Sequence, residues 1–264
     1  MIILKLVQFA NLPEVLTLGP ISFEQEYRIH YYEIDYKKRA LITSLMNYLD
    51  DAATCQSEKL GVGVDFLRER HLAWMLYKWD ITIHKYPVFG ESVKVETAPH
   101  SFNKFYAYRW FEILSQKGEK LVSATSQWLF VDTVKKRPIK IPKEMYEIYG
   151  AGPDDSLKIN EIAPPSSIDA EKIFHVRYSD IDTNRHVNNV KYAAWAIETV
   201  PLDIVLNCAL TNLKVTYKKE TTYGKTIKAR TQILKQGENT TCLHSIVDEN
   251  EEELCLLESK WVKI

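Results

Sequence analysis

The sequence has few cysteines and no long apolar run, and both absences narrow the class of protein. The four cysteines among 264 residues show no C-x-x-C or other zinc-binding spacing; they are Cys55, Cys208, Cys242 and Cys255. This usage is typical of a reducing compartment rather than of a disulfide framework. No apolar stretch approaches the roughly 18 residues that a membrane span requires. We therefore expect free thiols, a cytoplasmic location and no membrane partner.

An excess of one charge is also lacking. The chain has 34 Lys and Arg against 35 Asp and Glu, a net charge of -1 at pH 7. A nucleic-acid-binding protein needs a basic face to neutralise phosphates, and no such face is visible in the sequence. The hydrophobic share of 45% and the charged share of 26% are those of a soluble globular protein of one large or two ordinary domains.

Several common catalytic motifs are absent. The sequence has no G-x-S-x-G, no phosphate-binding P-loop and no H-E-x-x-H metal site. Gly61 and Gly63 match only two of the three glycines of the dinucleotide-binding motif G-x-G-x-x-G. They are better interpreted as the end of the preceding helix. We therefore predict that no cofactor or metal is needed. Residues 1–20 resemble a signal peptide only weakly, because Lys5 interrupts the apolar stretch and no basic region precedes it; we treat them as a leader that adds little to the fold.

The second half of the chain repeats the first. The stretch YRIHYYEID, ending at Asp35, is similar to FHVRYSDID, which ends at Asp182. The strand-like segments around Gly90 correspond to those around Gly224, and LVSATSQW corresponds to LCLLESKW. The tips SQKGEK and DENEEE lie between strand-like segments, where charge and Gly favour a solvated turn. The chain therefore consists of two copies of one unit: a strand, a long helix and several antiparallel strands.

Each copy contains one helix with an extensive apolar surface. In the first copy, apolar residues recur at three- and four-residue intervals from Ile42 to Ala53, before Gly61 and Gly63. In the second copy the helix should begin near Asn188 or Asn189, both good capping residues, and end before Pro201.

Such helices must be covered by sheet. The sequence therefore predicts an α+β fold, a tandem (double) hotdog with curved antiparallel sheets each wrapped around a central helix. We place the leader at 1–20, the N-terminal hotdog at 21–147, a linker at 148–170 and the C-terminal hotdog at 171–264. The stretch that separates the copies, residues 134–167, is rich in Lys, Pro and Gly.

The positions at which the two copies differ indicate where chemistry is located. Asn184 and His186 stand where the first copy has Lys37 and Arg39. Glu220 stands where the first copy has Tyr86. The polar set that the first copy lacks therefore lies in the C-terminal half.

The pattern D-x-N-x-H before a buried helix suits acyl transfer chemistry. It places Asp182, Asn184 and His186 beside the unpaired N–H groups and the positive end of the helix dipole. A carbonyl oxygen held there would be polarised, as in an oxyanion hole. His186 can titrate near neutral pH, and Glu220 could remove a proton from water if burial raised its pKa. Considered singly, Asp182 is equally consistent with a cap or turn residue, and His186 with a structural histidine.

Glu220 presents a geometric difficulty. In LKVTYKKE, Leu213, Val215 and Tyr217 share one face, so strict alternation sends Glu220 to the opposite, solvated face. A functional Glu220 requires a bulge or twist near Lys219.

These motifs resemble the acyl-(acyl-carrier-protein) thioesterases. The resemblance rests on DIDTNRHVNNVKYAAWAIETVP and VTYKKETTYG, and it extends through HYYEIDYKKRALITSLMNYLDDA, so it covers about residues 21–264. It implies a cofactor-free tandem-hotdog hydrolase of fatty acid biosynthesis that releases fatty acids from acyl carrier protein. The family's D-x-N-x-H positions fall on Asp182, Asn184 and His186, and its downstream glutamate falls on Glu220. Some plant members have a cysteine where this chain has Thr221, which excludes a thiol nucleophile there.

The resemblance implies residue roles and leaves alternatives. Glu220 would be the general base, Asn184 and His186 would orient the thioester, and Asp182 would fix the loop. Direct attack by a carboxylate stays open, as do hydrolysis of acyl-coenzyme A and a non-catalytic acyl-thioester sensor. The first copy would line the acyl pocket, with core packing as the alternative explanation for its candidate wall residues Trp74, Met75 and Leu76.

The expected partner is acyl carrier protein. A basic run could attract an acidic carrier or could simply be a solvated linker; it consists of Lys135, Lys136, Arg137, Lys140 and Lys143. A monomer or a homodimer is compatible with the duplication.

Overall fold

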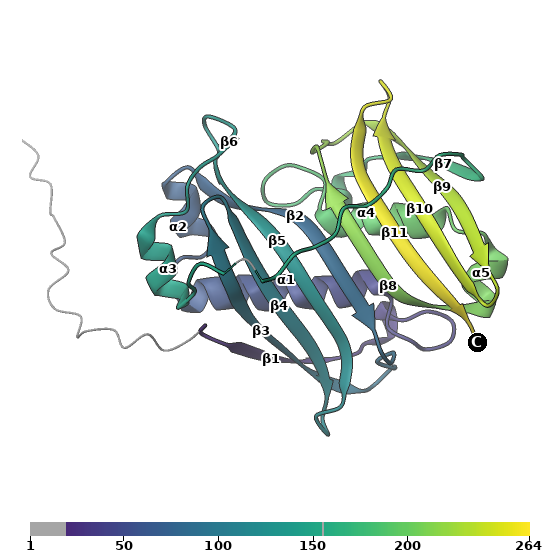
Figure 1. Ribbon diagram of the computed structural model, residues 1–264, viewed down its shortest axis with the longest axis horizontal. Helices are drawn as coiled ribbons and strands as arrows, with labels where there is room; N and C mark the ends of the chain where they lie inside the picture. Colours follow the sequence, from purple (N-terminus) through teal and green to yellow (C-terminus); the bar gives the residue numbers. More distant parts are fainter. Residues whose placement is uncertain (1–19, 155) are drawn as a thin grey trace, which may run out of the picture.

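A computed structural model describes residues 20–154 and 156–264. An antiparallel sheet curves around two central helices, as Figure 1 shows. The strands of the first copy are β1 (Phe23–Arg28), β2 (Leu72–Ile83), β3 (Ser92–Asn103), β4 (Tyr106–Ser115), β5 (Lys120–Asp132) and β6 (Arg137–Pro138). Those of the second copy are β7 (Ala170–His175), β8 (Cys208–Tyr217), β9 (Thr226–Gln236), β10 (Asn239–Asp248) and β11 (Glu253–Lys263). The helices are α1 (Ile42–Lys59), α2 (Val64–Glu69), α3 (Lys143–Tyr149), α4 (Asn189–Glu198) and α5 (Leu202–Asn207), with 3-10 turns at Tyr31–Glu33 and Tyr178–Asp180.

The strand order makes the duplication explicit. Along the sheet the order is β1-β3-β4-β5-β2-β8-β11-β10-β9-β7, with β6 paired to β5. From one end the order is β1-β3-β4-β5-β2, and from the other end it is the corresponding β7-β9-β10-β11-β8 of the second copy. The predicted duplicated unit and double hotdog are therefore confirmed. The two sheets are continuous, because β2 and β8 pair antiparallel from Lys78 opposite Thr216 to Thr82 opposite Asn212. This pairing leaves neither strand as an open edge at the centre.

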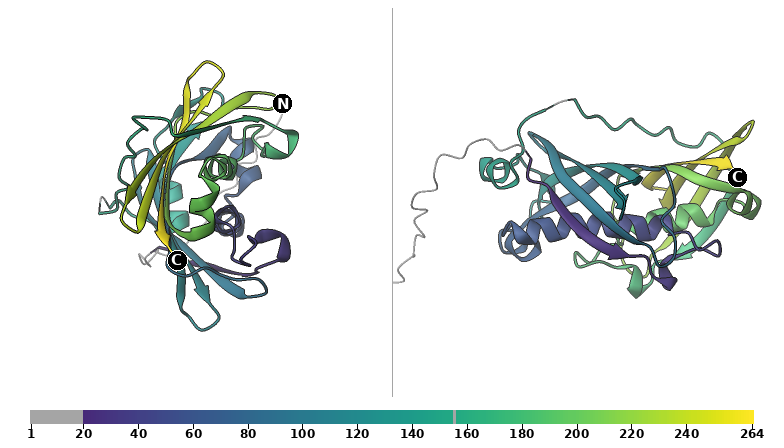
Figure 2. Two further views of the ribbon diagram at one scale, coloured as in Figure 1. Left: turned by 90° about the vertical axis from the view of Figure 1, so that its right-hand side faces the viewer. Right: turned by 90° about the horizontal axis from the view of Figure 1, so that it is seen from below.

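Both central helices lie on the concave face of the sheet, as the end-on view in Figure 2 shows. Leu45, Met46 and Leu49 of α1 have no exposed surface, because the three- and four-residue spacing places them on one stripe against the sheet. The second helix begins where the sequence predicts. Asn188 is its N-cap and accepts a hydrogen bond from the Val190 N–H at 2.9 Å, and the helix ends before Pro201.

The segment between the copies is packed against the convex face, on the opposite side from α1 and α4 (Figure 2). The helix α3 runs across the predicted boundary at residue 147, and β7 begins at Ala170. Ile159 and Ile162 are buried, and Glu161 forms an ion pair with Lys78, whose side chain is 4% exposed. The predicted leader lies outside the described residues except for Pro20. None of the helices in the described ranges has the length and apolar character needed to cross a membrane.

Candidate active site

Asp182 shapes the turn that precedes α4. Its Oδ1 accepts hydrogen bonds from the N–H groups of Asn184, at 2.8 Å, and His186, at 3.3 Å. The Asp182 N–H donates to the His186 carbonyl oxygen at 2.8 Å, and Arg185 takes a positive φ of 66°. An aspartate that bonds backbone groups two and four residues later is a turn-forming residue. The carboxylate therefore fixes the backbone that carries Asn184 and His186.

The first copy contains the same turn. Asp35 Oδ1 accepts from the N–H groups of Lys37, at 2.8 Å, and Arg39, at 2.9 Å, and Lys38 has a φ of 62°. The first copy lacks the Asn and His of the motif. The turn geometry made by this aspartate is therefore a property of the repeated scaffold and does not by itself indicate catalysis.

A bulge precedes Glu220. The strand β8 ends at Tyr217, and the N–H groups of Lys218 and Lys219 both donate to the Leu254 carbonyl oxygen, at 2.9 and 3.1 Å. Two consecutive donors on one acceptor break the alternation of the strand. This is the irregularity near Lys219 that a functional Glu220 requires.

Glu220 contacts His186. The distance from His186 Nδ1 to Glu220 Oε2 is 3.0 Å, and the two side chains are 35% and 50% exposed. Their backbones are tied together by the bond from the Val187 N–H to the Thr221 carbonyl oxygen, at 2.9 Å. A neutral imidazole that donates from Nδ1 to the carboxylate keeps Nε2 as its acceptor.

The equivalent pair in the first copy is Arg39 and Tyr86. The Arg39 guanidinium lies over the Tyr86 ring, 4.6 Å from its centroid, and pairs with Asp35 at 2.8 Å. The scaffold therefore brings together the same two positions in both copies, but only the second copy has an imidazole beside a carboxylate there.

Asn184 is exposed on the same turn, and Asn188 caps the helix that follows. The positive end of α4 thus faces the region of His186. Three of the four predicted site residues, Asp182, His186 and Glu220, are linked by direct contacts of the turn and of the side chains. Asn184 joins them through its main-chain N–H.

Asp180 was not predicted from the sequence. It has no exposed surface, and its carboxylate pairs with Arg177 at 2.9 Å and with Lys191 at 3.5 Å. Burial opposes its ionisation, but the hydrogen bonds from Arg177 outweigh burial and lower the pKa of Asp180. The internal repeat could have indicated this residue, because Asp180 stands at the position of Glu33 in the first copy. Both carboxylates fix the start of the turn.

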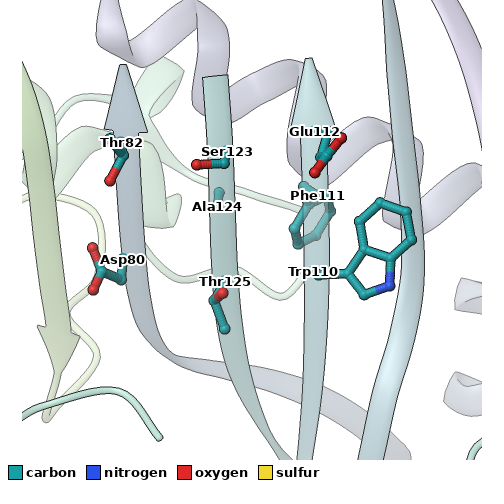
Figure 3. A pocket seen from close by; sticks show the side chains of 8 residues that line it. All are labelled: Asp80, Thr82, Trp110, Phe111, Glu112, Ser123, Ala124 and Thr125. Atoms are coloured by element: carbon teal, nitrogen blue, oxygen red, sulfur yellow. The ribbon is translucent and has the colours of Figure 1, made fainter. Parts of the chain in front are cut away.

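In the described part of the chain, each copy has a surface hollow. One of about 570 Å³ separates β7 from α4; Phe174 and Trp195 line it, with Arg177 and Lys191 on the side of the turn. The other, of about 310 Å³, lies over β2, β4 and β5 and contains none of the predicted site residues (Figure 3). The lining of the first hollow contains none of these site residues either, but its Arg177 and Lys191 pair with Asp180 at the start of the turn.

Other candidate residues lie apart from this turn. Trp74 packs against Phe130 at a centroid distance of 4.5 Å and Leu76 is buried in the main core, whereas Met75 is 42% exposed, so the three do not form one wall. The basic run around Lys136 is exposed beside β6. Within residues 20–154 and 156–264, no three His, Cys, Asp or Glu side chains gather in an arrangement suited to a metal ion.

Comparison with known families agrees with the duplicated architecture. The model of the acyl-ACP thioesterase N-terminal domain matches residues 20–149, and that of the C-terminal domain matches residues 165–263. A palmitoyl-acyl carrier protein thioesterase of Gossypium hirsutum is 32% identical over 215 residues, covering 76% of this chain and 52% of the relative. An acyl-[acyl-carrier-protein] hydrolase of Cuphea viscosissima is 28% identical over 257 residues, covering 91% of this chain and 62% of the relative. The chain thus spans between about half and two thirds of the length of these relatives.

Solved structures show the same fold. A Lactobacillus plantarum protein assigned as an oleoyl thioesterase superposes with a TM-score of 0.89 at 29% identity, covering 94% of this chain and 98% of the other. The 12:0-ACP thioesterase of Umbellularia californica superposes with a TM-score of 0.81 at 24% identity, covering 92% and 94%, and supports the fold alone. With both domain models matched in order, the chain belongs to the acyl-ACP thioesterase family.

Proposed function

We propose that this chain hydrolyses fatty acyl thioesters of acyl carrier protein, releasing the fatty acid and the free carrier thiol at one site in its C-terminal half. The observation that carries the proposal is the contact of His186 with Glu220 on the turn before α4. In the first copy the same positions hold Arg39 and Tyr86, which cannot serve as a proton acceptor near neutral pH. The plant relatives are named for hydrolysis of the carrier-linked thioester.

The geometry supports a water-based mechanism. Glu220 accepts a hydrogen bond from His186 Nδ1, which directs the free electron pair of Nε2 outward. Nε2 takes a proton from water as the water oxygen attacks the thioester carbonyl carbon. The C–S bond then breaks, and the imidazolium returns the proton to the departing sulfur. The contact thus favours His186 as the base and Glu220 as the residue that orients it, a reversal of the roles that the resemblance implies.

The negative charge that develops on the carbonyl oxygen needs donors. The exposed Asn184 carboxamide lies on the turn, and the N-terminal end of α4 follows it directly. Donors of this kind typically contribute about 10²- to 10³-fold in kcat each. We assign the Asn184 carboxamide and the N–H groups at the start of α4 as the donors to this oxyanion.

A nucleophilic Asp182 is the less favoured alternative. Its Oδ1 already accepts two backbone N–H groups, as does that of Asp35 in the copy without the histidine and glutamate. The same bonding in both copies is what a turn-forming role predicts.

Thiol release from one acyl chain presented on carrier protein and on coenzyme A tests the proposal. We expect Glu220→Gln to lose turnover of both the carrier-linked and the coenzyme A thioester. For the wild type, we expect kcat/KM to be higher for the carrier-linked thioester. Preference for coenzyme A would reassign the substrate. Saturable binding of both thioesters without release of thiol would indicate a sensor.

A further inference from the structure

The side chain of Asp50 lies between the two central helices, and no cation among the described residues acts on its pKa. Asp50 belongs to α1, and α1 packs against α4. The side chain of Asn189, the first residue of α4, hydrogen-bonds the Asp50 carboxyl group. The Oδ1 atoms of both residues are buried and have no hydrogen-bond partner. A buried acceptor that no group donates to destabilises the folded state.

One proton would satisfy both atoms. A carboxylic acid and a carboxamide can form two hydrogen bonds at once, with the acid O–H donating to the amide oxygen and the amide N–H₂ donating to the acid oxygen. An ionised carboxylate can accept from the amide but cannot donate to it.

We propose that Asp50 is a neutral carboxylic acid paired with the Asn189 carboxamide, and that this pair positions the turn that carries His186. Asn189 follows the helix cap Asn188 and lies three residues after His186. A contact that fixes the first residue of α4 from α1 therefore fixes the end of the catalytic turn. The catalytic consequence rests on the proposed function, whereas the protonation state does not.

The surroundings of Asp50 are neutral. Burial raises its pKa to about 7, against the opposing effect of the Asn189 hydrogen bond. Tyr217 of β8 donates its hydroxyl to the Asn189 carbonyl oxygen at 3.1 Å, and Cys255 of β11 lies beyond it. Burial raises the pKa of both groups well above their ordinary values, so both are uncharged. No charged group on β1, β3 or α2 in the described part of the chain acts on the pKa of Asp50.

The repeat supplies an internal comparison. Asp50 corresponds to Ile197 of α4, and Asn189 corresponds to Ile42 of α1. Both isoleucines belong to the apolar core. The two equivalent positions therefore hold apolar residues in the fold, and the polar residues stand at the positions beside the turn with His186 and Glu220. A role in folding alone would not require that asymmetry.

The protonation state is tested by carbon-13 NMR of the aspartate carboxyl groups in the full chain, titrated from about pH 3 to 9. The Asp50 resonance is identified by its loss in Asp50→Asn. We expect it to titrate near pH 7, so that Asp50 is a neutral acid below that pH and ionises above it. Titration near the ordinary aspartate value of about 3.9 would overturn the proposal. This readout needs no turnover, so it stays informative even if the chain is not a thioesterase.

The positioning role is tested by kinetics. Asp50→Asn keeps a neutral hydrogen-bonding pair, and we expect kcat within about threefold of the wild type, since an isosteric neutral partner replaces the acid. The double variant Asp50→Ile, Asn189→Ile copies the apolar pair of the other copy, and we expect kcat to fall by more than about tenfold with KM little changed. Asp51→Asn, on the exposed side of α1, is the matched control. Full activity in the double variant, or loss in Asp50→Asn as severe as in the double variant, would contradict the positioning role.

Discussion

A histidine and a glutamate stand in the C-terminal half where the N-terminal half has an arginine and a tyrosine. His186 and Glu220 are 3.0 Å apart, and Arg39 stacks on Tyr86 at 4.6 Å. The guanidinium of Arg39 stays charged at any physiological pH and cannot accept a proton. We therefore expect one active site per chain, although the backbone around both pairs is the same.

Replacement of this pair should remove activity without unfolding the chain. His186→Gln and Glu220→Gln should each lower kcat by about 10²- to 10⁴-fold, because the base or its orienting group is lost. Both side chains are at least 35% exposed, so we expect thermal midpoints close to that of the wild type. Thiol release and thermal denaturation measured on the same preparations check this. Arg39→Gln, at the equivalent position, should leave turnover unchanged in the folded protein.

Two substitutions at Asp182 distinguish a turn-forming role of this residue from a nucleophilic role. Asp182→Asn retains an oxygen that can accept the two N–H groups, so we expect activity within about tenfold of the wild type. Asp182→Ala removes the acceptor and should cost about 1 kcal/mol of stability as well as more activity. Asp35→Asn is the control in the first copy. Complete loss of turnover in Asp182→Asn with an intact fold would instead support a carboxylate nucleophile.

The sequence predicts local contacts better than distant ones. Asp182, Asn184 and His186 lie within five residues, so their motif predicts a common turn. The contact of Glu220 with His186 follows an irregularity at the Leu254 carbonyl oxygen of a neighbouring strand, which strict alternation within one strand does not predict. The contact of Asp50 with Asn189 depends on the packing of two helices far apart in the chain, which no local pattern encodes.

At the scale of single elements, three adjacent strands hold a buried histidine. His244 of β10 contacts the hydroxyl groups of Thr231 on β9 and Ser259 on β11, both at 2.8 Å. Burial lowers the pKa of His244 to about 3, so the imidazole is neutral in the folded state. At the equivalent position the first copy has Phe111. The polar network thus replaces an aromatic side chain at the same level of the sheet.

This histidine predicts a pH dependence of stability. Its folded pKa is lower than the unfolded value of about 6.5, so its stabilising effect is present above pH 6.5 and is lost as pH falls toward 3. The slope should approach about 1.4 kcal/mol per pH unit within that window. His244→Phe should remove the slope and lower stability at pH 7.5 by about 1–3 kcal/mol, because the hydroxyl groups of Thr231 and Ser259 each lose their hydrogen bond to the imidazole.

Urea denaturation at pH 7.5, 6 and 5 measures this effect. The effect of Asp50 on stability has the opposite sign. Because the folded pKa of Asp50 is raised, its stabilising effect is present at low pH and is lost as pH rises from about 4 to 7. The relevant quantity is therefore the difference between wild type and His244→Phe at each pH. A difference that does not change with pH would contradict the assignment of a neutral, buried His244.

At the scale of the whole molecule, β2 and β8 join the two copies. The Asn212 side chain on β8 donates to Asp80 at 2.8 Å, to the Ile81 carbonyl oxygen at 3.0 Å and to Thr82 at 3.1 Å, all on β2. We expect Asn212→Ala to lower the free energy of unfolding by about 1–3 kcal/mol, because these bonds cross the junction. Calorimetry should show one transition for the wild type, and two resolved transitions would contradict a cooperative junction.

The duplicated sequence predicts the elements and their order, but not how the copies meet. Alternation and helical spacing report which side of an element is buried, and both copies satisfy those patterns separately. The continuous sheet arises because two strands far apart in the chain pair with each other. The burial of Ile159 and Ile162 likewise depends on where the linker crosses the sheet, and its polar composition alone favoured a solvated segment.

The central claim is that the His186 and Glu220 pair hydrolyses a carrier-linked acyl thioester. The most direct test is steady-state release of free carrier thiol from an acyl-carrier-protein series of different chain lengths, with wild type and Glu220→Gln side by side. We predict turnover by the wild type on at least one chain length and a loss of about 10²-fold or more in the variant. Equal turnover by the variant would contradict the assigned site, and no turnover by the wild type on any carrier substrate would contradict the assigned activity.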